Sequence, residues 1–319
     1  MTPPFSPHTP VMLNETVKAL SPRDGAIYVD ATFGAGGYAE ALLETADCTV
    51  WGIDRDPEAL TIGDGLRRRY QGRLTVLNGR FGDMVRLLGD VGIDKIDGLA
   101  LDLGVSSMQL DQPERGFSFR ADGPLDMRME QSGMTAAEAV NQLTEPELAD
   151  IIYRYGEERS SRRIAKAIVK SRRENPITRT GQLAKLVRGV VAKSKDGLDP
   201  ATRTFQALRI YVNDELGELE RGLNAAETLL RPGGRLVVVS FHSLEDRQVK
   251  EFLQGRSGGK PKPSRHLPPD TSPPAEPTFL LLRRRVVKPS AAEAEANPRA
   301  RSARLRAAER TPAPARQAA

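Results

Sequence analysis

The chain has 319 residues, with 47 Lys or Arg against 42 Asp or Glu, so that the net charge is +5 and the isoelectric point is near 9.4. One cysteine excludes a disulfide framework and a cysteine-rich zinc site, and the three histidines lack metal-ligand spacing, so we expect no metal site. The sequence begins without a secretory signal and holds no apolar run of about 18 residues. We therefore expect a cytoplasmic protein that does not bind membranes.

Residues 26–104 alternate short apolar runs with helical patterns. The expected strands are 27–30, 50–54, 74–77 and 96–102, and the expected helices are 38–46, 57–70 and 83–88. Repeated strand–helix units form a doubly wound, mostly parallel sheet with right-handed crossovers. The predicted fold class is therefore α/β, with a Rossmann-like sheet.

Helical patterns replace the strand signal from about residue 113 to residue 215. One of them opens with the capping-box spacing of Thr135 and Glu138. We interpret 113–215 as an inserted helical subdomain that binds the substrate. The sheet domain then consists of residues 1–112 and 216–288.

The chain returns to the sheet after this insertion. An amphipathic pattern runs from Ala201 towards Leu230 and stops at the Arg-Pro-Gly-Gly-Arg sequence 231–235, which indicates a turn. The remaining elements are expected as a buried strand over 236–241, a helix over 244–253, a mobile Pro/Gly-rich loop over 255–277 and a last strand over 279–287. The basic tail, 289–319, is expected to be largely disordered unless RNA or the domain surface orders it.

The basic residues are concentrated in two regions. Residues 151–195 hold thirteen Lys or Arg against three Glu, and residues 256–319 hold fourteen against five acidic residues. The remainder of the chain is strongly acidic. Two positive regions on an acidic protein are typical of an electrostatic footprint for a phosphate backbone. A solvated helix face together with a disordered tail is the alternative that composition leaves open.

A glycine-rich loop with glycines at 34, 36 and 37 follows the first expected strand, where the backbone can approach a ligand at a helix N-terminus. The pattern Gly34-x-Gly36-x-x-Ala39 also satisfies the dinucleotide fingerprint with alanine in third place. Asp54, at the end of the second strand, offers a carboxylate to both hydroxyls of a ribose. These features predict an adenosine-type cofactor without distinguishing between the classes.

Asp102 ends the strand 96–102, and ligand crevices in open α/β sheets lie beyond such carboxyl ends. With Asp30 and Asp54 at neighbouring strand ends, the acidic groups favour a cationic cofactor such as S-adenosylmethionine and disfavour a diphosphate. Helix caps and turn formers are the alternative interpretation of each aspartate. Phe81 follows the third strand, where an aromatic ring can wall an adenine, and a purely structural phenylalanine fits there equally well.

Six segments carry a resemblance to a known family. They are His8-Thr-Pro-Val-Met-Leu-Asn-Glu15, Asp30-Ala-Thr-Phe-Gly-Ala-Gly-Gly37, Ile53-Asp-Arg-Asp-Pro57, the stretch 99–129, Val239-Ser-Phe-His-Ser-Leu-Glu-Asp-Arg247 and Asn297-Pro-Arg-Ala-Arg-Ser-Ala-Arg-Leu-Arg306. With them the chain resembles the ribosomal RNA small-subunit methyltransferase H family, also called the MraW family, over nearly its whole length. The glycine loop is common to many folds, whereas the loop after Asp102 and the segment 240–246 are specific to that family.

The resemblance implies a class I S-adenosylmethionine-dependent methyltransferase fold. It implies methyl transfer to the exocyclic N4 of a cytidine in the decoding region of 16S rRNA, within the small ribosomal subunit. The cofactor contacts carried over by motif are Gly36, Gly37, Tyr38, Asp54, Phe81, Asp102 and Gln109. Tyr38 departs from the family, which usually has His there: a backbone contact survives that change, and a role that needs an imidazole does not.

Two residues are candidates for the chemistry on the amine. Asp102 can draw the amine towards tetrahedral geometry, and His242 can contact the base or relay a proton, or else merely fix a loop. An aromatic face is expected to stack on the base once it has left its stack, with one of Phe117, Phe119, Tyr153 and Tyr155 as the partner and core packing as the alternative. The candidates for binding RNA phosphates are Arg162, Arg163, Lys166, Lys170, Arg172 and Arg173.

Other function classes remain open to the sequence. A nicotinamide-dependent oxidoreductase fits the glycine loop and Asp54 but has no accompanying constellation for hydride transfer. A non-catalytic rRNA-binding assembly factor could keep an old cofactor fold, and a methyltransferase could act instead on adenine N6 or on a protein side chain. The sequence does not distinguish a monomer from a homodimer.

Overall fold

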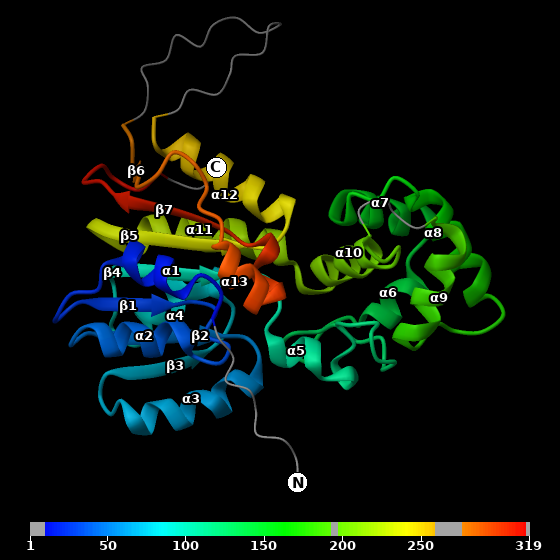
Figure 1. Ribbon diagram of the computed structural model, residues 1–319, viewed down its shortest axis with the longest axis horizontal. Coiled ribbons are helices and arrows are strands. Elements are labelled where there is room, and N and C mark those ends of the chain that lie inside the picture. Colours follow the sequence, from blue (N-terminus) through cyan, green and yellow to red (C-terminus); the bar gives the residue numbers. More distant parts are fainter. Residues whose placement is uncertain (1–9, 193–196, 259–275, 317–319) are drawn as a thin grey trace, which may run out of the picture. The chain divides into compact units, whose positions relative to one another are not determined.

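Seven strands of the described chain form one sheet in the order β3-β2-β1-β4-β5-β7-β6 (Figure 1). The structure is a computed structural model that describes residues 10–192, 197–258 and 276–316. The strands are β1 (Ile27–Asp30), β2 (Thr49–Asp54), β3 (Leu74–Asn78), β4 (Ile96–Asp102), β5 (Leu230–Ser240), β6 (Phe279–Leu281) and β7 (Arg304–Arg310). Strands β1 to β5 pair in parallel, and β7 is antiparallel to both of its neighbours. This topology confirms the predicted α/β fold class.

Helices cover both faces of this sheet. One face carries α1 (Leu13–Leu20), α2 (Gly37–Thr45) and α3 (Pro57–Arg69), and the other carries α4 (Met84–Gly89), α11 (Glu215–Leu229) and α12 (Ser243–Arg256). Side chains alternate along β4, where Ala100 belongs to the first core and its neighbours Leu99 and Leu101 to the second. This alternation is the period-two pattern of a strand buried on both faces.

The chain divides into two compact units. The sheet unit consists of residues 1–104 and 217–319, and the helical unit of residues 105–216. The helical unit begins earlier than residue 113 because Val105 and Leu110 pack against its own core.

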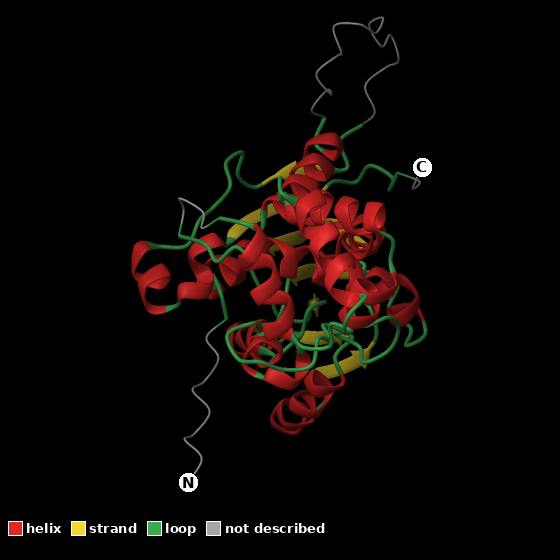
Figure 2. Cartoon of the chain, turned by 90° about the vertical axis from the view of Figure 1, so that its right-hand side faces the viewer, coloured by secondary structure: helices red, strands yellow, loops and turns green. Residues whose placement is uncertain are grey.

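The helical unit consists of short helices joined by loops (Figure 2). They are α5 (Ser107–Asp111), the 3-10 turn η2 (Pro113–Arg115), α6 (Ala136–Gln142), α7 (Glu145–Gly156), α8 (Ser161–Arg172), α9 (Thr180–Val190) and α10 (Thr202–Asn213). The capping box predicted at Thr135 is present, since the Thr135 hydroxyl accepts from the Glu138 N–H at 3.1 Å and the Glu138 carboxylate accepts from the Thr135 N–H at 2.7 Å.

Three predicted boundaries differ from the structure. The pattern from Ala201 to Leu230 is two helices, because Asp214 adopts a left-handed backbone with φ 51° between α10 and α11. The sequence 231–235 is not a separate turn but an irregularity at the start of β5, where the register with β4 shifts between Ile96 and Gly98. The strand expected over 279–287 is β6, which ends at Leu281. Of the residues expected beyond it, Val287 forms only an isolated bridge with Leu305. Most of the expected 255–277 loop lies outside the described residues.

The expectation of a disordered tail is wrong for residues 290–310. They form α13 (Ala291–Ala296), the 3-10 helix η3 (Pro298–Ser302) and β7, which lies between β5 and β6 in the sheet. Leu305 and Ala308 of β7 are buried in opposite faces of the sheet, and Asp246 of α12 pairs with both Arg304 and Arg306 at 2.9 and 2.7 Å. Sheet pairing and these ion pairs therefore order a segment whose composition indicates disorder.

No helix within the described ranges is long and apolar enough to cross a bilayer.

We expect a chain that ends at Lys288 to lose its cooperative thermal unfolding transition. That truncation removes β7, so that β5 and β6 lose their shared partner and Asp246 is left without its two arginines. A chain that ends at Ala313 keeps all of β7 and is the matched control. Scanning calorimetry of both, against the full chain, is the measurement, and a cooperative transition in the Lys288 truncation close to that of the control would contradict this assignment.

Candidate cofactor and active site

Three carboxyl groups lie at the carboxyl ends of adjacent parallel strands in the sheet unit. Asp30 ends β1, Asp54 ends β2 and Asp102 ends β4. Because β1 pairs in parallel with both β2 and β4, the three strands have their carboxyl ends on the same side of the sheet, and the three aspartates lie there. The groups are close enough for Asp54 to raise the pKa of Asp30, and for Asp30 to raise the pKa of Asp102.

Asp102 has the most strongly perturbed environment of the three. Burial raises the pKa of its carboxyl group well above the usual range, and the nearby Asp30 and Glu245 raise it further. Its main-chain N–H donates to the Thr32 hydroxyl at 2.6 Å, which fixes the end of β4 against the loop after β1. Its Oδ1 atom is buried without a hydrogen-bond partner in the described part of the chain. An unpaired buried acceptor next to other carboxyls is the kind of site that a cationic or N–H-bearing ligand satisfies.

Asp30 has a structural role in addition to its charge. Its carboxylate accepts from the Ala39 N–H at 3.2 Å, in the first turn of α2, so it caps that helix. Burial raises the pKa of Asp30 to about 7, against the opposing effect of the Ala39 hydrogen bond. The interpretation of Asp30 as a helix cap is therefore supported, and the group still changes its charge near neutral pH.

Asp54 is held in a fixed orientation by two main-chain donors. Its carboxylate accepts from the Gly34 N–H at 2.7 Å and from the Asp56 N–H at 2.8 Å, one on each oxygen. Burial nevertheless raises the pKa of Asp54. Since each carboxylate oxygen has a second lone pair, the side chain can still accept a pair of hydroxyl groups.

The glycines of the loop after β1 are required by packing. Gly36 has φ 78°, and a Cβ there would lie 2.4 Å from Leu66 and 2.7 Å from Phe33. A Cβ at Gly37 would lie 2.1 Å from the ring of Pro10. The loop and the N-terminus of α2 thus pack closely against Leu66, Phe33 and Pro10, which accounts for both glycines without a ligand. The cofactor contact that the motif predicts for these glycines can be made only by their backbone groups.

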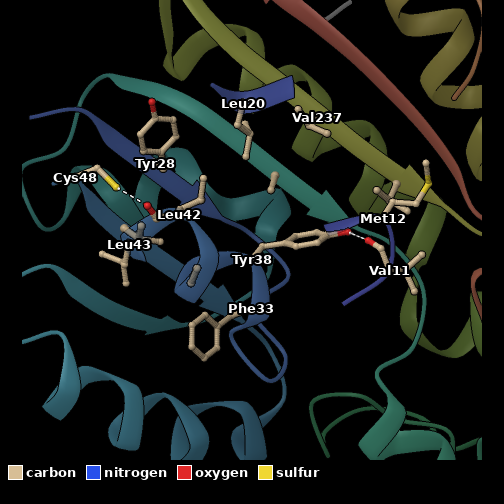
Figure 3. Packing of buried hydrophobic residues seen from close by; sticks show 14 of the residues in the cluster. Val11, Met12, Leu20, Tyr28, Phe33, Tyr38, Leu42, Leu43, Cys48 and Val237 are labelled. Carbon is tan, nitrogen blue, oxygen red and sulfur yellow. Dashed lines mark hydrogen bonds between the residues drawn. The ribbon is translucent and has the colours of Figure 1, made fainter. Parts of the chain in front are cut away.

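Tyr38 is a core residue in this chain. Its side chain is 4% exposed, and its hydroxyl donates to the carbonyl of Val11 (Figure 3). Burial and the nearby Asp102 raise the pKa of Tyr38 well above its usual range, so the hydroxyl keeps its proton. The side chain therefore fastens the N-terminal segment to α2, and a cofactor contact by Tyr38 is restricted to its backbone.

Phe81 lies in the 3-10 turn η1 (Phe81–Asp83), which follows β3 at the same edge of the sheet. Its ring packs on Gly222 of α11, where a Cβ would lie 2.5 Å from the ring. Nearby, the buried Arg55 and Glu218 side chains pair at 2.6 Å and connect the end of β2 to α11. Phe81 is thus a partly buried wall that α11 supports, which fits both its predicted role against an adenine and a structural one.

His242 caps α12. Its Nδ1 accepts from the Glu245 N–H at 3.4 Å, and its Nε2 lies 3.0 Å from the Glu245 carboxylate. The same carboxylate accepts from the N–H groups of Phe241 and His242 at 2.8 and 3.2 Å. These contacts favour the interpretation of His242 as a residue that fixes the loop after β5.

Gln109 is buried in the helical unit and caps α5. Its side-chain oxygen accepts from the Ser106 N–H at 3.0 Å, and its own N–H donates to the Ser106 hydroxyl at 3.2 Å. Six of the seven predicted cofactor contacts therefore lie at or just after the carboxyl ends of the strands β1 to β4 in the sheet unit: Gly36, Gly37, Tyr38, Asp54, Phe81 and Asp102. Gln109 belongs to the other unit.

The four candidate stacking aromatics have different environments within the helical unit. Phe117 is buried, and Phe119 packs edge-on against Phe205 with ring centroids 4.8 Å apart. Tyr155 is half-buried, whereas Tyr153 is 61% exposed on α7. Tyr153 is thus the most exposed of the four.

The six candidate phosphate ligands divide into two groups. Arg162, Lys166 and Lys170 follow one another at four-residue spacing on α8, so they form one exposed stripe opposite the buried Ile164 and Ile168. Arg163 and Arg173 are also exposed, although Arg163 donates to the Val190 carbonyl. Arg172 donates to the carbonyls of Val140 and Leu143 at 2.7 Å, so its guanidinium is occupied in holding the end of α6.

Two contacts at the site were missed by sequence reasoning. Glu245 organises the loop after β5, and its spacing from His242 is that of a capping box, which is a usable sequence signal once histidine is accepted as the cap. The segment from Pro10 to Met12 lies against the glycine loop, and the Met12 N–H donates to Glu293 of α13 at 2.6 Å. No local pattern predicts that second contact, because it joins residues near opposite ends of the chain.

The chain is similar to known proteins over nearly its whole length. The chain matches the sequence model described as the MraW methylase family over residues 5–311. The chain belongs to this family. It is 67% identical to the ribosomal RNA small subunit methyltransferase H of Rhodospirillum centenum over 310 residues, which cover 97% of this chain and 94% of the relative. It is 62% identical to the protein of the same name from Paramagnetospirillum magneticum, with 97% of each chain covered. The family resemblance seen in the sequence is thereby confirmed.

We expect the substitution Tyr38→Phe to lower the free energy of unfolding by about 1 kcal/mol, because it leaves the buried Val11 carbonyl without its donor. Amide exchange of α1 is expected to become faster at the same time. Tyr153→Phe removes a hydroxyl from an exposed ring and is the matched control, with no change expected. Equal unfolding free energies for Tyr38→Phe and the parent in urea titrations would show that this hydrogen bond does not fasten the segment.

Proposed function

We propose that this protein is an S-adenosylmethionine-dependent methyltransferase that modifies the exocyclic N4 of a cytidine in the decoding region of 16S rRNA. The substrate is the rRNA within the small ribosomal subunit, in the cytoplasm. The observation that carries the proposal is the cluster of buried carboxyls at the ends of β1, β2 and β4. Family membership and the printed names of its relatives support the reaction class and the rRNA substrate.

The donor set at this edge fits a cationic adenosyl cofactor. The buried Oδ1 of Asp102 lacks a partner among the described residues, and Asp30 lies close enough to raise its pKa. A sulfonium and an ammonium group lower the cost of ionising such carboxyls, whereas the pyrophosphate of a nicotinamide cofactor raises it. The site therefore favours S-adenosylmethionine over NAD, although Gly34, Gly36 and Ala39 satisfy the dinucleotide pattern.

The residues of the sheet unit have separate roles in holding this cofactor. Asp54 accepts the ribose hydroxyls, with its orientation fixed by the main chain around it. Phe81 walls the adenine, and the backbone of Gly36, Gly37 and Tyr38 lines the amino-acid end. Gln109, which the family resemblance also implies as a cofactor contact, belongs to the helical unit.

When bound, S-adenosylmethionine supplies an electrophilic methyl group. A cytosine amine is a weak nucleophile because its lone pair is delocalised into the ring, so the protein must align it and accept hydrogen bonds from it. The carboxyl of Asp102 is the acceptor at the end of β4. In its ionised form this carboxylate can accept a hydrogen bond from the amine and take up the proton that the amine releases when the methyl group is transferred. His242 positions the adjoining loop through its contacts with Glu245.

The helical unit binds the RNA backbone in this proposal. The stripe of Arg162, Lys166 and Lys170 offers exposed cations at a regular spacing, and phosphate contacts of this kind position RNA without reading its sequence. Tyr153 is the proposed stacking residue for a base outside its helix. Arg172 is left out because its guanidinium is already bonded to α6.

The reaction is tested by incubating the protein with labelled S-adenosylmethionine and small subunits that lack this modification, followed by nucleoside mass spectrometry. We expect label in N4-methylcytidine. The substitution Asp102→Asn is expected to lower the rate about 100-fold, as for loss of one electrostatic group at a reacting centre, whereas Asp90→Asn, at an exposed carboxyl, leaves it unchanged. Label in another nucleoside would overturn the target, and no label would favour a non-catalytic assembly factor.

Reversing the α8 stripe, as Arg162→Glu, Lys166→Glu and Lys170→Glu together, is expected to weaken RNA binding at least tenfold and to flatten its salt dependence. Affinity for S-adenosylmethionine should not change. The matched control reverses three exposed arginines of the sheet unit, Arg67, Arg68 and Arg86, which makes the same change in net charge. Filter binding across a range of potassium chloride concentrations measures the RNA affinity of both variants and its salt dependence. Equal losses of RNA affinity in the two variants would remove the stripe from the RNA interface.

A further inference from the structure

The second basic region of the chain, from residue 256 to the end, has no role in the proposal so far. Most of its described arginines have structural partners. Arg256 pairs with Glu227 at 2.8 Å, and Arg304 and Arg306 pair with Asp246. Arg310 is buried and donates to the carbonyls of Glu227 and Thr278. These contacts connect α11, α12 and β7, so the four arginines are not free cations.

Arg283, Arg284 and Arg285 differ from those structural arginines. Leu282 separates them from the end of β6, all three are exposed, and none has an ion pair in the described part of the chain. Lys250 of α12 is likewise exposed and without an ion pair among the described residues. A phosphate that binds these cations therefore breaks no ion pair within the described part of the protein.

A hollow in the surface brings several of these cations together. It is lined by Lys250 from α12, by Arg283 and Arg284 from the end of β6 and by Arg306 from β7, and it has no carboxylate in its lining. Leu253 and Leu281 also belong to its lining. Figure 1 shows β6, β7 and α12 together at one side of the sheet. We name this hollow the β6 cationic hollow.

We propose that the β6 cationic hollow binds phosphate groups of the RNA substrate, as a second backbone contact on the sheet unit. This inference rests on the proposed function, because it takes the substrate to be RNA. Arginine guanidinium groups bind phosphate oxygens through paired N–H donors, and neighbouring cations can contact successive phosphates of a nucleic-acid backbone. Lys250, Arg283 and Arg284 have no ion pair among the described residues, so contact of these three with phosphates gives the full gain from counterion release, whereas Arg306 is already paired with Asp246.

The same region shows why the basic tail folds back into the sheet. β7 carries Arg306 into the hollow while Asp246 keeps that arginine in place at 2.7 Å. The pairing of β6 with β7 through Leu281 and Ala308 fixes where the chain leaves the sheet, just before Arg283 and Arg284. The hollow thus depends on the ordered tail, whose composition alone indicated disorder.

The test is the double substitution Arg283→Glu with Arg284→Glu in the full chain. Its matched control is Arg67→Glu with Arg68→Glu on α3, which lies against β3 at the opposite edge of the sheet and makes the same change in net charge. Binding is measured for a protein-free transcript of the small-subunit rRNA and for intact small subunits, at 50 to 200 mM salt. S-adenosylmethionine affinity is measured on each variant to show that the fold is intact.

We expect the hollow variant to bind the transcript about tenfold more weakly at 50 mM salt, with a salt slope smaller by about two, while the α3 control changes by less than twofold. Equal changes in the two variants would overturn the hollow as a phosphate site. A loss seen with intact subunits but not with the transcript would also overturn it, in favour of a protein partner. If the unmodified protein binds neither RNA, the proposed function fails, whereas normal binding by the parent and by the hollow variant refutes only this inference.

Discussion

The proximity of three buried carboxyl groups at the carboxyl ends of β1, β2 and β4 is the constraint on which the rest of the site depends. Asp30, Asp54 and Asp102 are brought together because β1 pairs in parallel with β2 on one side and β4 on the other. Burial raises the pKa of all three, to about 7 for Asp30, and repulsion from Asp54 and from Asp30 adds to the rise at Asp30 and at Asp102. Such an arrangement is unfavourable in an isolated fold when every group is ionised, and a bound cation relieves it.

The linkage between these groups and stability has a definite sign. Asp30 has a higher pKa in the folded chain than its ordinary value of 3.8, so the folded state binds more protons than the unfolded state between about pH 4 and 7. The contribution of Asp30 to folding stability is therefore largest in acid and is lost as the pH rises through 7. A cationic ligand weakens this trend, because it favours the ionised carboxyl and lowers the pKa of Asp30.

The site is also braced by segments from both ends of the chain. Pro10 lies against Gly37, the Val11 carbonyl accepts from Tyr38, and the Met12 N–H donates to Glu293 of α13. The hydroxyl of Tyr38 thus fastens this segment to α2. The glycine loop therefore depends on long-range packing as much as on its own sequence.

The sequence predicted those parts of the fold that local patterns specify. The strand–helix alternation over 26–104 and the capping box at Thr135 are of this kind, because period-two burial and a local hydrogen bond leave a signal within a few residues. The order of β7 left no such signal, since its arginines are satisfied by Asp246, which lies 58 and 60 positions earlier in the chain. The same limit applies to Arg172. Its position in a basic helix fits a phosphate ligand, but its guanidinium is bonded to two carbonyls at the end of α6.

Proton release on cofactor binding tests the central claim most directly. Titration calorimetry near pH 7, in buffers of different ionisation enthalpy, measures the protons released when S-adenosylmethionine or S-adenosylhomocysteine binds. The carboxyl cluster predicts net release with S-adenosylmethionine, because its positive charge lowers the pKa of Asp30 and Asp102, and a clearly smaller release with S-adenosylhomocysteine, which lacks the sulfonium charge. Equal release for the two ligands, or none for either, would contradict the account.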